Sequence, residues 1–127
     1  MQGGITMEII PDLPAIKMVW QATVTGHEVR STFNRLQAQL SEAEVPQYVV
    51  LDLTAEPQFP LKEATAAALF GPYRHPMAAE WLVIGTSEVW KFVEHTLVLA
   101  TNERKIRWFK TLDEVTAYIH QRLTYSN

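Results

Sequence analysis

The chain has 127 residues and contains no cysteine. With 47% hydrophobic residues, 20% charged residues and a net charge of −3, its composition is that of an ordinary folded protein, and its length predicts a single domain over residues 1–127. The absence of cysteine excludes disulfides, thiol nucleophiles and thiolate metal ligands. The richest basic run is short, at residues 104–107, so we expect no nucleic-acid partner.

The sequence shows no sign of a membrane span or a secretion signal. No apolar run approaches the roughly 18 residues that a membrane-spanning helix needs. The first residues, MQGGITMEII, lack a basic start followed by a long apolar segment. We therefore expect a cytoplasmic protein.

Two β-rich segments open the chain. Residues 5–10 and 15–23 are rich in β-branched and aromatic side chains, and the PDLP segment between them carries two prolines, which a strand ladder excludes. This pattern predicts an antiparallel hairpin. In its second strand, alternation places four side chains on the face expected to meet the core: Ile16, Met18, Trp20 and Ala22.

The middle of the chain predicts a helix, a buried strand and a second helix. A capping box, TGHE, begins a helix over residues 26–43. Residues 48–53 form an almost continuous apolar run, as expected of a central parallel strand that is buried on both faces. Pro60 suits the first turn of a short, alanine-rich helix over residues 61–70, which a Gly-Pro pair ends.

The last part of the chain continues the alternation of strands and helices. Residues 81–85 (WLVIG) predict a strand that pairs with residues 49–53, and Thr86 or Ser87 caps the next helix. Residues 105–109 predict a last strand, and a second capping box, TLDE, begins a final helix. The order ββαβαβαβα predicts an α/β fold with one mixed, mostly parallel five-stranded sheet, an N-terminal hairpin and about four helices.

Three segments resemble a known fold family in their order and spacing: VVLDL at residues 49–53, VIGTSEVW at residues 83–90 and IRWFKTLDEVTAYI at residues 106–119. The resemblance is to the SpoIIAA-like fold, that of the STAS domains of anti-sigma-factor antagonists and of related STAS/Sec14-like bacterial proteins. Trp90 and Phe109 stand in places that match the STAS/Sec14-like pattern. The resemblance covers nearly the whole chain and implies a non-enzymatic regulatory or protein-interaction domain.

One part of the family pattern is missing. Antagonists of the STAS type are switched by phosphorylation of a serine at the start of the helix that follows the acidic strand, where the added charge repels the partner. Residues 59–65 (FPLKEAT) contain no serine, and Thr65 lies about a turn too far into the helix. The resemblance therefore does not extend to a phosphorylation switch.

Polar residues and a glycine follow the two central strands where each strand ends, namely Asp52, Gly85, Thr86 and Ser87. The carboxyl ends of parallel strands form the edge where ligands collect, and a helix start offers free N–H groups to an anion. Each residue also has a local alternative, because Asp52 can bind loop amides and Thr86 or Ser87 can cap a helix. No GxGxxG or GxxxxGK[ST] motif is present, and we expect no cofactor.

The sequence carries no catalytic or metal-binding constellation. Its histidines, at positions 27, 75, 95 and 120, lack HxH or HExxH spacing, so we expect no metal site. A Ser-His-Asp set could be assembled from Ser87, Asp52 and either His75 or His95, but no Gly-x-Ser-x-Gly elbow is present. We expect no enzymatic activity.

Apolar residues around the alanine-rich helix support a first functional hypothesis. Phe59, Leu61, Phe70 and Tyr73 flank this helix, either as an exposed patch for a partner or as the mouth of an apolar pocket. We hypothesise an interaction module whose segment from Thr54 to Tyr73 contacts another protein or a second copy of the chain, as a homodimer.

The alanines themselves support a second hypothesis. Ala64, Ala67 and Ala68 are small, and a cavity beneath them, between their helix and the helix after Ser87, would take an acyl chain, a lipid or another apolar molecule. The resemblance to Sec14-like proteins, which carry lipids, implies the same class of ligand.

Overall fold

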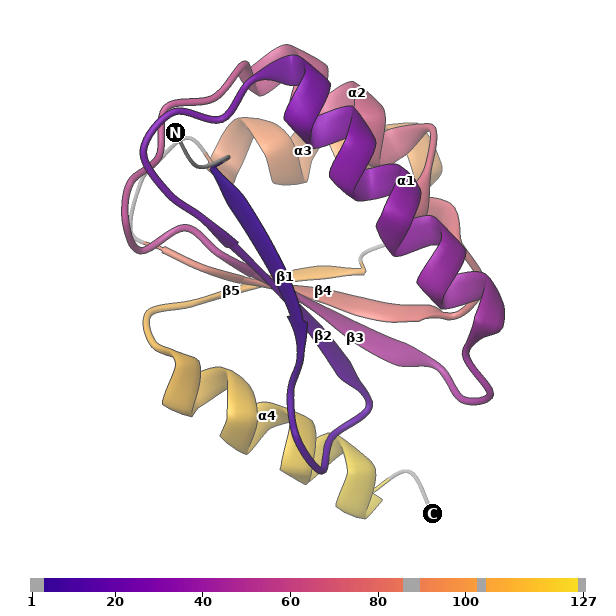
Figure 1. Ribbon diagram of the computed structural model, residues 1–127. Helices are drawn as coiled ribbons and strands as arrows, with labels where there is room; N and C mark the ends of the chain where they lie inside the picture. The colour runs from indigo at the N-terminus through magenta and orange to yellow at the C-terminus, as the bar shows by residue number, and fades with distance from the viewer. Residues whose placement is uncertain (1–3, 86–89, 103–104, 126–127) are drawn as a thin grey trace.

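A computed structural model describes residues 4–85, 90–102 and 105–125. These residues form one five-stranded sheet with helices on both faces (Figure 1). The strands lie side by side in chain order: β1 (Ile5–Ile9), β2 (Ala15–Trp20), β3 (Gln47–Asp52), β4 (Ala78–Ile84) and β5 (Ile106–Phe109). β1 pairs with β2 in antiparallel orientation, and the other three pairs are parallel. The predicted α/β fold, with its hairpin and mostly parallel sheet, is confirmed.

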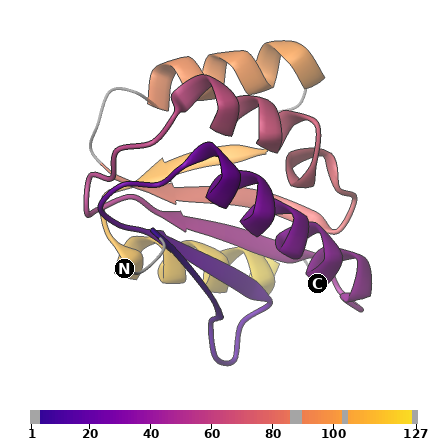
Figure 2. The same ribbon diagram turned by 45° about the horizontal axis from the view of Figure 1, so that its top comes forward.

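Three helices share one face of the sheet, and a fourth covers the other. α1 (Gly26–Glu42), α2 (Leu61–Leu69) and α3 (Trp90–Thr101) lie side by side on one face, whereas α4 (Leu112–Tyr125) lies on the opposite face (Figure 1 and Figure 2). A short 3-10 helix, η1 (Pro72–Arg74), follows α2. Each of the three parallel crossovers places its new strand on the same side of the preceding one. Because such crossovers are right-handed, their helices all lie on one face of the sheet.

The first helix begins at the predicted capping box. The Thr25 side chain accepts a hydrogen bond from the Glu28 amide at 3.1 Å, and the Glu28 carboxylate accepts one from the Thr25 amide at 3.0 Å. The same carboxylate accepts a hydrogen bond from the Gly4 amide at 2.6 Å, which ties the start of β1 to the helix. The backbone hydrogen bonds from Thr25 and then Gly4 lower the pKa of the Glu28 carboxyl, because they favour its charged form.

The sheet separates two apolar cores. The larger core lies between the sheet and α1, α2 and α3, and the smaller one lies between the sheet and α4. β3 contributes to both, since Val49 faces the first core, its neighbour Val50 faces the second, and both are fully buried. This confirms that β3 is a central strand buried on both faces.

Two strands differ by more than one residue at an end from the sequence-based prediction. β2 ends at Trp20 rather than at Thr23, because Ala22 has a φ of 54°, a left-handed conformation that ends the extended strand. Ala22 is also exposed, so the prediction that it faces the core is wrong. β4 begins at Ala78 rather than at Trp81, because the start of β3 pairs with Ala78.

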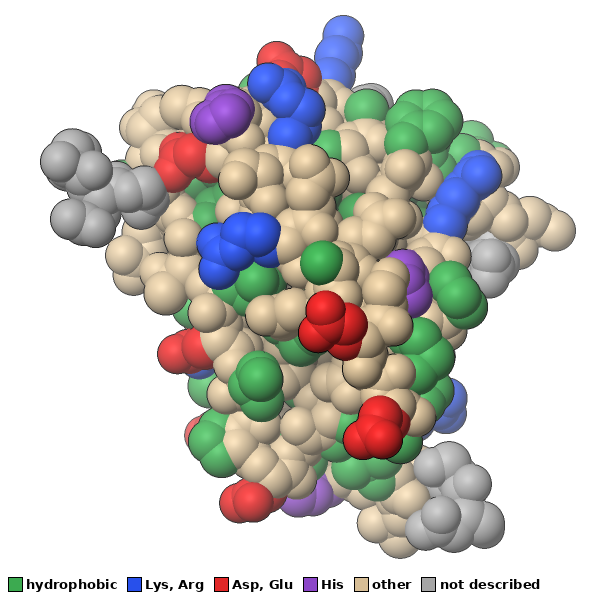
Figure 3. Space-filling view, turned by 45° about the vertical axis from the view of Figure 1, so that its right-hand side comes forward, with side chains coloured by type: hydrophobic (Ala, Val, Ile, Leu, Met, Phe, Trp, Pro, Cys, Tyr) green, Lys and Arg blue, Asp and Glu red, His purple; other side chains and the backbone are tan. Residues whose placement is uncertain are grey.

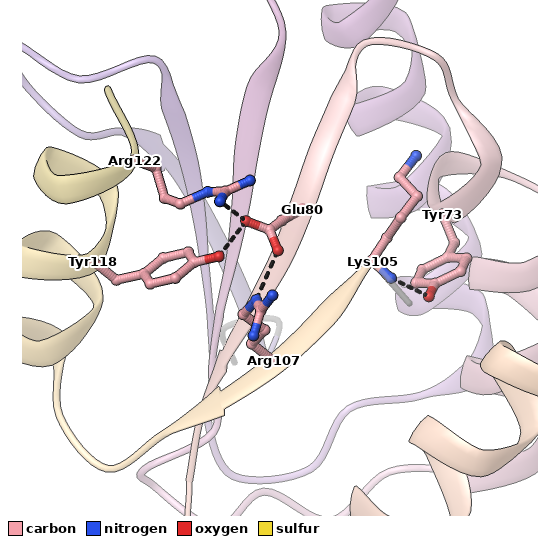
Figure 4. Close-up of polar contacts among 6 residues, drawn as sticks. All are labelled: Tyr73, Glu80, Lys105, Arg107, Tyr118 and Arg122. Carbon is pink, nitrogen blue, oxygen red and sulfur yellow. Dashed lines mark hydrogen bonds and ion pairs between the residues drawn. The ribbon is translucent and has the colours of Figure 1, made fainter. Parts of the chain in front are cut away.

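A buried carboxylate joins α4 to the sheet (Figure 4). Glu80 on β4 is 8% exposed, and its carboxylate accepts hydrogen bonds from the Tyr118 hydroxyl at 2.6 Å and from Arg107 Nε at 2.8 Å. Arg122 Nε lies 3.8 Å from the same carboxylate. Burial, followed by the hydrogen bond to Glu80, raises the pKa of Tyr118 to about 12. The partners offset the cost of burying the Glu80 charge and fix the position of α4.

Replacement of Tyr118 by phenylalanine removes one of these hydrogen bonds. We expect Tyr118→Phe to lower the free energy of unfolding by about 1.5 kcal/mol, the lower end for a hydrogen bond to a charged group, because Tyr118 is only half-buried. The matched control is Tyr48→Phe. Tyr48 belongs to the same core, and its hydroxyl makes no hydrogen bond within the described residues. Urea unfolding at neutral pH measures both, and equal losses in the two variants would contradict the assigned role.

We expect the stability difference between the unsubstituted protein and Tyr118→Phe to depend on pH. The pKa of Tyr118 is raised in the folded chain from its ordinary value of 10.0 to about 12, so the hydroxyl contributes full stability below about pH 10. That contribution is lost as the pH rises from about 10 to about 12. The stability difference between the unsubstituted protein and Tyr118→Phe should therefore shrink when unfolding is measured at about pH 11 instead of about pH 8.

Candidate functional site

An apolar cavity of about 270 Å³ lies within the larger core, between α2, α3 and the sheet. Side chains from four strands, three helices and the loop after β3 line it: Trp20, Phe33, Leu51, Leu53, Glu56, Pro57, Phe59, Ala64, Thr65, Ala68, Trp81, Val83, Gly85, Val93, Leu97, Ile106 and Trp108. Glu56 is the one exposed residue among these, so the cavity reaches the surface at the loop after β3. Protein interiors otherwise contain few voids larger than a water molecule, and this space therefore needs an explanation.

Small side chains on α2 account for the space. α2 presents Ala64, Thr65 and Ala68 to the interior, and each of these residues is at most 7% exposed. An alanine reaches only one carbon beyond the backbone, so the helix does not fill the volume in front of it. Ala67 is half-buried and does not line the cavity.

Packed aromatic side chains line the cavity away from the alanines of α2. Phe33 on α1 packs between the two indoles, with ring centroids 6.2 Å from Trp20 and 5.6 Å from Trp81. Phe59 meets Trp20 edge to face, at 5.1 Å and an interplanar angle of 88°. Rings packed in this geometry attract one another beyond the burial of their surface. Their contacts build a continuous aromatic wall along the cavity.

The loop after β3 forms the mouth of the cavity. Gln58 ties this loop to the segment after β2, because its amide donates to Ala22 O at 2.8 Å and its carbonyl accepts from Val24 N at 2.7 Å. Glu56 holds a left-handed conformation with φ 53°, which turns the chain between the end of β3 and Gln58. Leu53 and Gly85, at the ends of β3 and β4, line the cavity beside the loop.

The polar residues predicted at this edge have different surroundings. Asp52 Oδ1 accepts hydrogen bonds from the amide and the hydroxyl of Thr54, at 2.9 and 2.7 Å, which is the local loop role that the sequence left open for it. Neither Asp52 nor Thr54 lines the cavity, whereas Gly85 does. Thr86 and Ser87 lie outside the described residues.

The four residues expected to flank α2 do not form one surface. Phe59 lines the cavity, Leu61 is half-buried at the first position of α2, and Phe70 is 81% exposed. Tyr73 is fully buried and packs against Trp81, and its hydroxyl accepts a hydrogen bond from the Lys105 amide at 3.1 Å (Figure 4). The expectation of a shared exposed patch is therefore wrong for Tyr73.

The sequence indicated the cavity but not most of its walls. The row of alanines predicted a space beneath Ala64, Ala67 and Ala68, and of these Ala64 and Ala68 line it. The sequence placed Trp20 toward the core and gave Trp81 and Trp108 no separate role, because nothing local distinguishes an indole that fills a core from one that borders a cavity. The contrast between aromatic strand residues and a helix of alanines was the one available signal.

Few polar groups are available for chemistry in the cavity. Thr65 is 5% exposed, and its hydroxyl donates to Leu61 O at 2.8 Å, one turn earlier in the helix. Among the described residues, no cluster of three or more His, Cys, Asp or Glu side chains has the arrangement to hold a metal ion. Within residues 4–85, 90–102 and 105–125, no helix has the length and apolar character needed to cross a membrane.

Comparison with known proteins shows the fold. No protein-family profile and no curated protein sequence matches the chain. The structure is similar to that of an uncharacterised protein of the DUF3478 family with a SpoIIAA-like fold from Shewanella loihica PV-4, with a TM-score of 0.64, 14% sequence identity and coverage of 91% of each chain. It is also similar to the anti-sigma factor antagonist SpoIIAA in its unphosphorylated form, with a TM-score of 0.69, 10% identity and coverage of 91% of this chain and 97% of that one. The chain has a SpoIIAA-like fold, as the sequence resemblance implied.

Filling the cavity tests whether the space is open in solution. We expect Ala68→Leu, which points extra carbons into the cavity, to leave the free energy of unfolding unchanged or to raise it by up to about 1 kcal/mol. Ala15→Leu adds the same atoms at a fully buried position of the smaller core and should cost about 1–3 kcal/mol. Urea unfolding of both variants checks this, and a comparable loss in Ala68→Leu would show that the space is not open.

Proposed function

We propose that this chain is a non-enzymatic binding module whose cavity takes a small apolar molecule. The observation that carries the proposal is the cavity of about 270 Å³ with almost entirely apolar walls. An engineered apolar cavity of about 150 Å³ in another protein stays dry and binds benzene. A larger cavity that is mostly apolar and opens to solvent at one end supports an apolar ligand larger than one ring, such as a fused-ring compound or a short acyl chain.

The position of the cavity also supports ligand entry from solvent. Its mouth lies at the carboxyl ends of β3 and β4, the edge at which ligands bind in open parallel sheets. Leu53 and Gly85 line it there, and Glu56 reaches the surface. A ligand entering beside the loop would bury itself against α2 without any separation of the sheet strands.

We also propose a regulatory role for this chain. A SpoIIAA-like fold is shared with SpoIIAA, an anti-sigma factor antagonist, and is compatible with a domain that binds and signals rather than catalyses. Thr65, the hydroxyl residue nearest to the family's phosphorylation position, is buried and hydrogen-bonded to the helix backbone. We therefore propose a cytoplasmic single-domain regulator, spanning residues 1–127, that responds to ligand occupancy rather than to phosphorylation of α2.

Tetralin, a fused-ring hydrocarbon, tests ligand binding directly. Ligand-observed NMR should show that the unsubstituted protein binds tetralin, and that Ala68→Leu weakens the affinity at least about tenfold by occupying the cavity. Ala66→Leu makes the same change on the exposed side of α2 and should bind like the unsubstituted protein. Equal binding by both variants would place any tetralin site elsewhere and contradict the proposal.

An exposed aromatic residue favours a second candidate function, contact with another protein or with a second copy of the chain. Phe70, at the C-terminal end of α2, is 81% exposed, an unusual environment for a large aromatic side chain. Both acidic and basic side chains occur on the face drawn in Figure 3, and its apolar side chains form separate small groups. That face therefore lacks the single-sign charge pattern that steers a strongly charged partner.

Self-association through Phe70 has a measurable consequence. If Phe70 lies in a homodimer interface, size-exclusion chromatography with light scattering should give a dimer for the unsubstituted chain and a monomer for Phe70→Ser. Val45→Ser is the matched control, since Val45 is a 53% exposed apolar residue between α1 and β3. A monomer for the unsubstituted chain, or equal masses for all three proteins, would contradict a homodimer through α2.

A further inference from the structure

The aromatic residues that line the cavity differ in how much surface they offer. Trp20, Phe33 and Trp81 are at most 3% exposed, so they form the deep part of the wall. Phe59 and Trp108 also line the cavity and are only half-buried, so they keep accessible surface. A molecule that enters the cavity therefore meets these two rings directly.

The two accessible rings stand on opposite sides of the cavity. Trp108 on β5 is paired with Val83 on β4, and Val83 is paired with Leu51 on β3. Phe59 lies on the other side of β3, because it packs edge to face against Trp20 at the end of β2. β2 and β5 are three strand spacings apart, about 14 Å. Leu51 and Val83 line the cavity between the two rings.

Rings in a cavity wall favour an aromatic guest whichever way they are turned. A ring carries negative charge over its face and positive charge along its edge, so the edge of one ring attracts the face of another. A wall ring that presents its face attracts the edge of an aromatic ligand, and one that presents its edge attracts the face. A saturated hydrocarbon of the same shape gains only the burial of its surface.

Two further properties of the cavity disfavour an acyl chain. A flexible chain loses rotational freedom when it is confined, whereas a fused ring is rigid before it binds. A free fatty acid also carries a carboxylate at neutral pH. At the mouth it would meet the exposed Glu56, which is the one charged residue among the described lining residues. No Lys, Arg or His in the described part of the lining is present to offset that repulsion.

We propose that the cavity binds a planar, fused-ring aromatic molecule without negative charge, held between Phe59 and Trp108. This inference rests on the proposed function and restricts the ligand from apolar molecules in general to aromatic ones. One face of the ligand lies toward Leu51 on the sheet. The other lies toward Ala64 and Ala68 on α2, where the small side chains leave room for a flat molecule.

Four hydrocarbons of ten carbons each test the inference: naphthalene, tetralin, decalin and n-decane. The first three share a fused two-ring frame with two, one and no aromatic rings, and the fourth is a flexible chain. Each affinity, measured by NMR titration, is divided by the hexadecane–water partition coefficient of the probe, so that the burial of apolar surface cancels. The normalised affinity of naphthalene should exceed that of decalin by roughly twofold to tenfold for each ring contact, with tetralin between them and n-decane weakest.

Substitutions connect this preference to the two rings. Phe59→Leu and Trp108→Leu each keep an apolar side chain and remove a ring, so each should lower the naphthalene-to-decalin ratio by roughly twofold to tenfold. Phe109→Leu is the matched control and should leave the ratio unchanged, because Phe109 packs against the smaller core. If a ring variant does not fold, nuclear Overhauser contacts from naphthalene to the ring protons of Phe59 and Trp108 in the unsubstituted protein test the same assignment.

The outcomes distinguish this inference from the proposed function. Equal normalised affinities for naphthalene and decalin would overturn the aromatic inference and leave the binding of an apolar ligand intact. A ratio that neither ring variant lowers, or tightest binding of n-decane, would also overturn the aromatic inference alone. If none of the four hydrocarbons binds, the inference and the proposed function are both wrong.

Discussion

The parallel pairing of β3 with β4 is the contact on which the rest of the structure depends. Both strands are central, so their alternating side chains build the two cores at once, with Val49 and Trp81 on one face and Val50 and Leu82 on the other. Their register also brings the end of β3 beside the end of β4, where the Leu53 amide donates to a β4 carbonyl at 2.8 Å. The mouth of the cavity is therefore a direct consequence of strand pairing.

The two faces of the sheet are packed differently. On the α4 face, apolar residues surround a buried carboxylate, Glu80, whose hydrogen bonds to Tyr118 and Arg107 join helix and sheet. On the opposite face, large aromatic residues meet a helix of alanines, and the mismatch in size leaves a cavity. The contacts of Glu80 therefore lie on the face of the sheet that is turned away from the cavity.

The proposed ligand chemistry follows from what this cavity contains. Its walls favour apolar surface, and the lack of a cation among its described lining residues disfavours an anion. Both constraints favour an uncharged, apolar molecule.

The sequence by itself determined the order of strands and helices, the hairpin, the capped start of α1 and the acidic end of β3, because periodicity, caps and prolines act on neighbouring residues. It also indicated space beneath the alanines of α2. Only the tertiary structure decided that Tyr73 is buried while Phe70 is exposed, and that the indoles of Trp20 and Trp81 border empty space. Those properties depend on how α1, α2 and η1 pack against distant strands, and side chains of one chemical type carry no local mark of which neighbour they will meet.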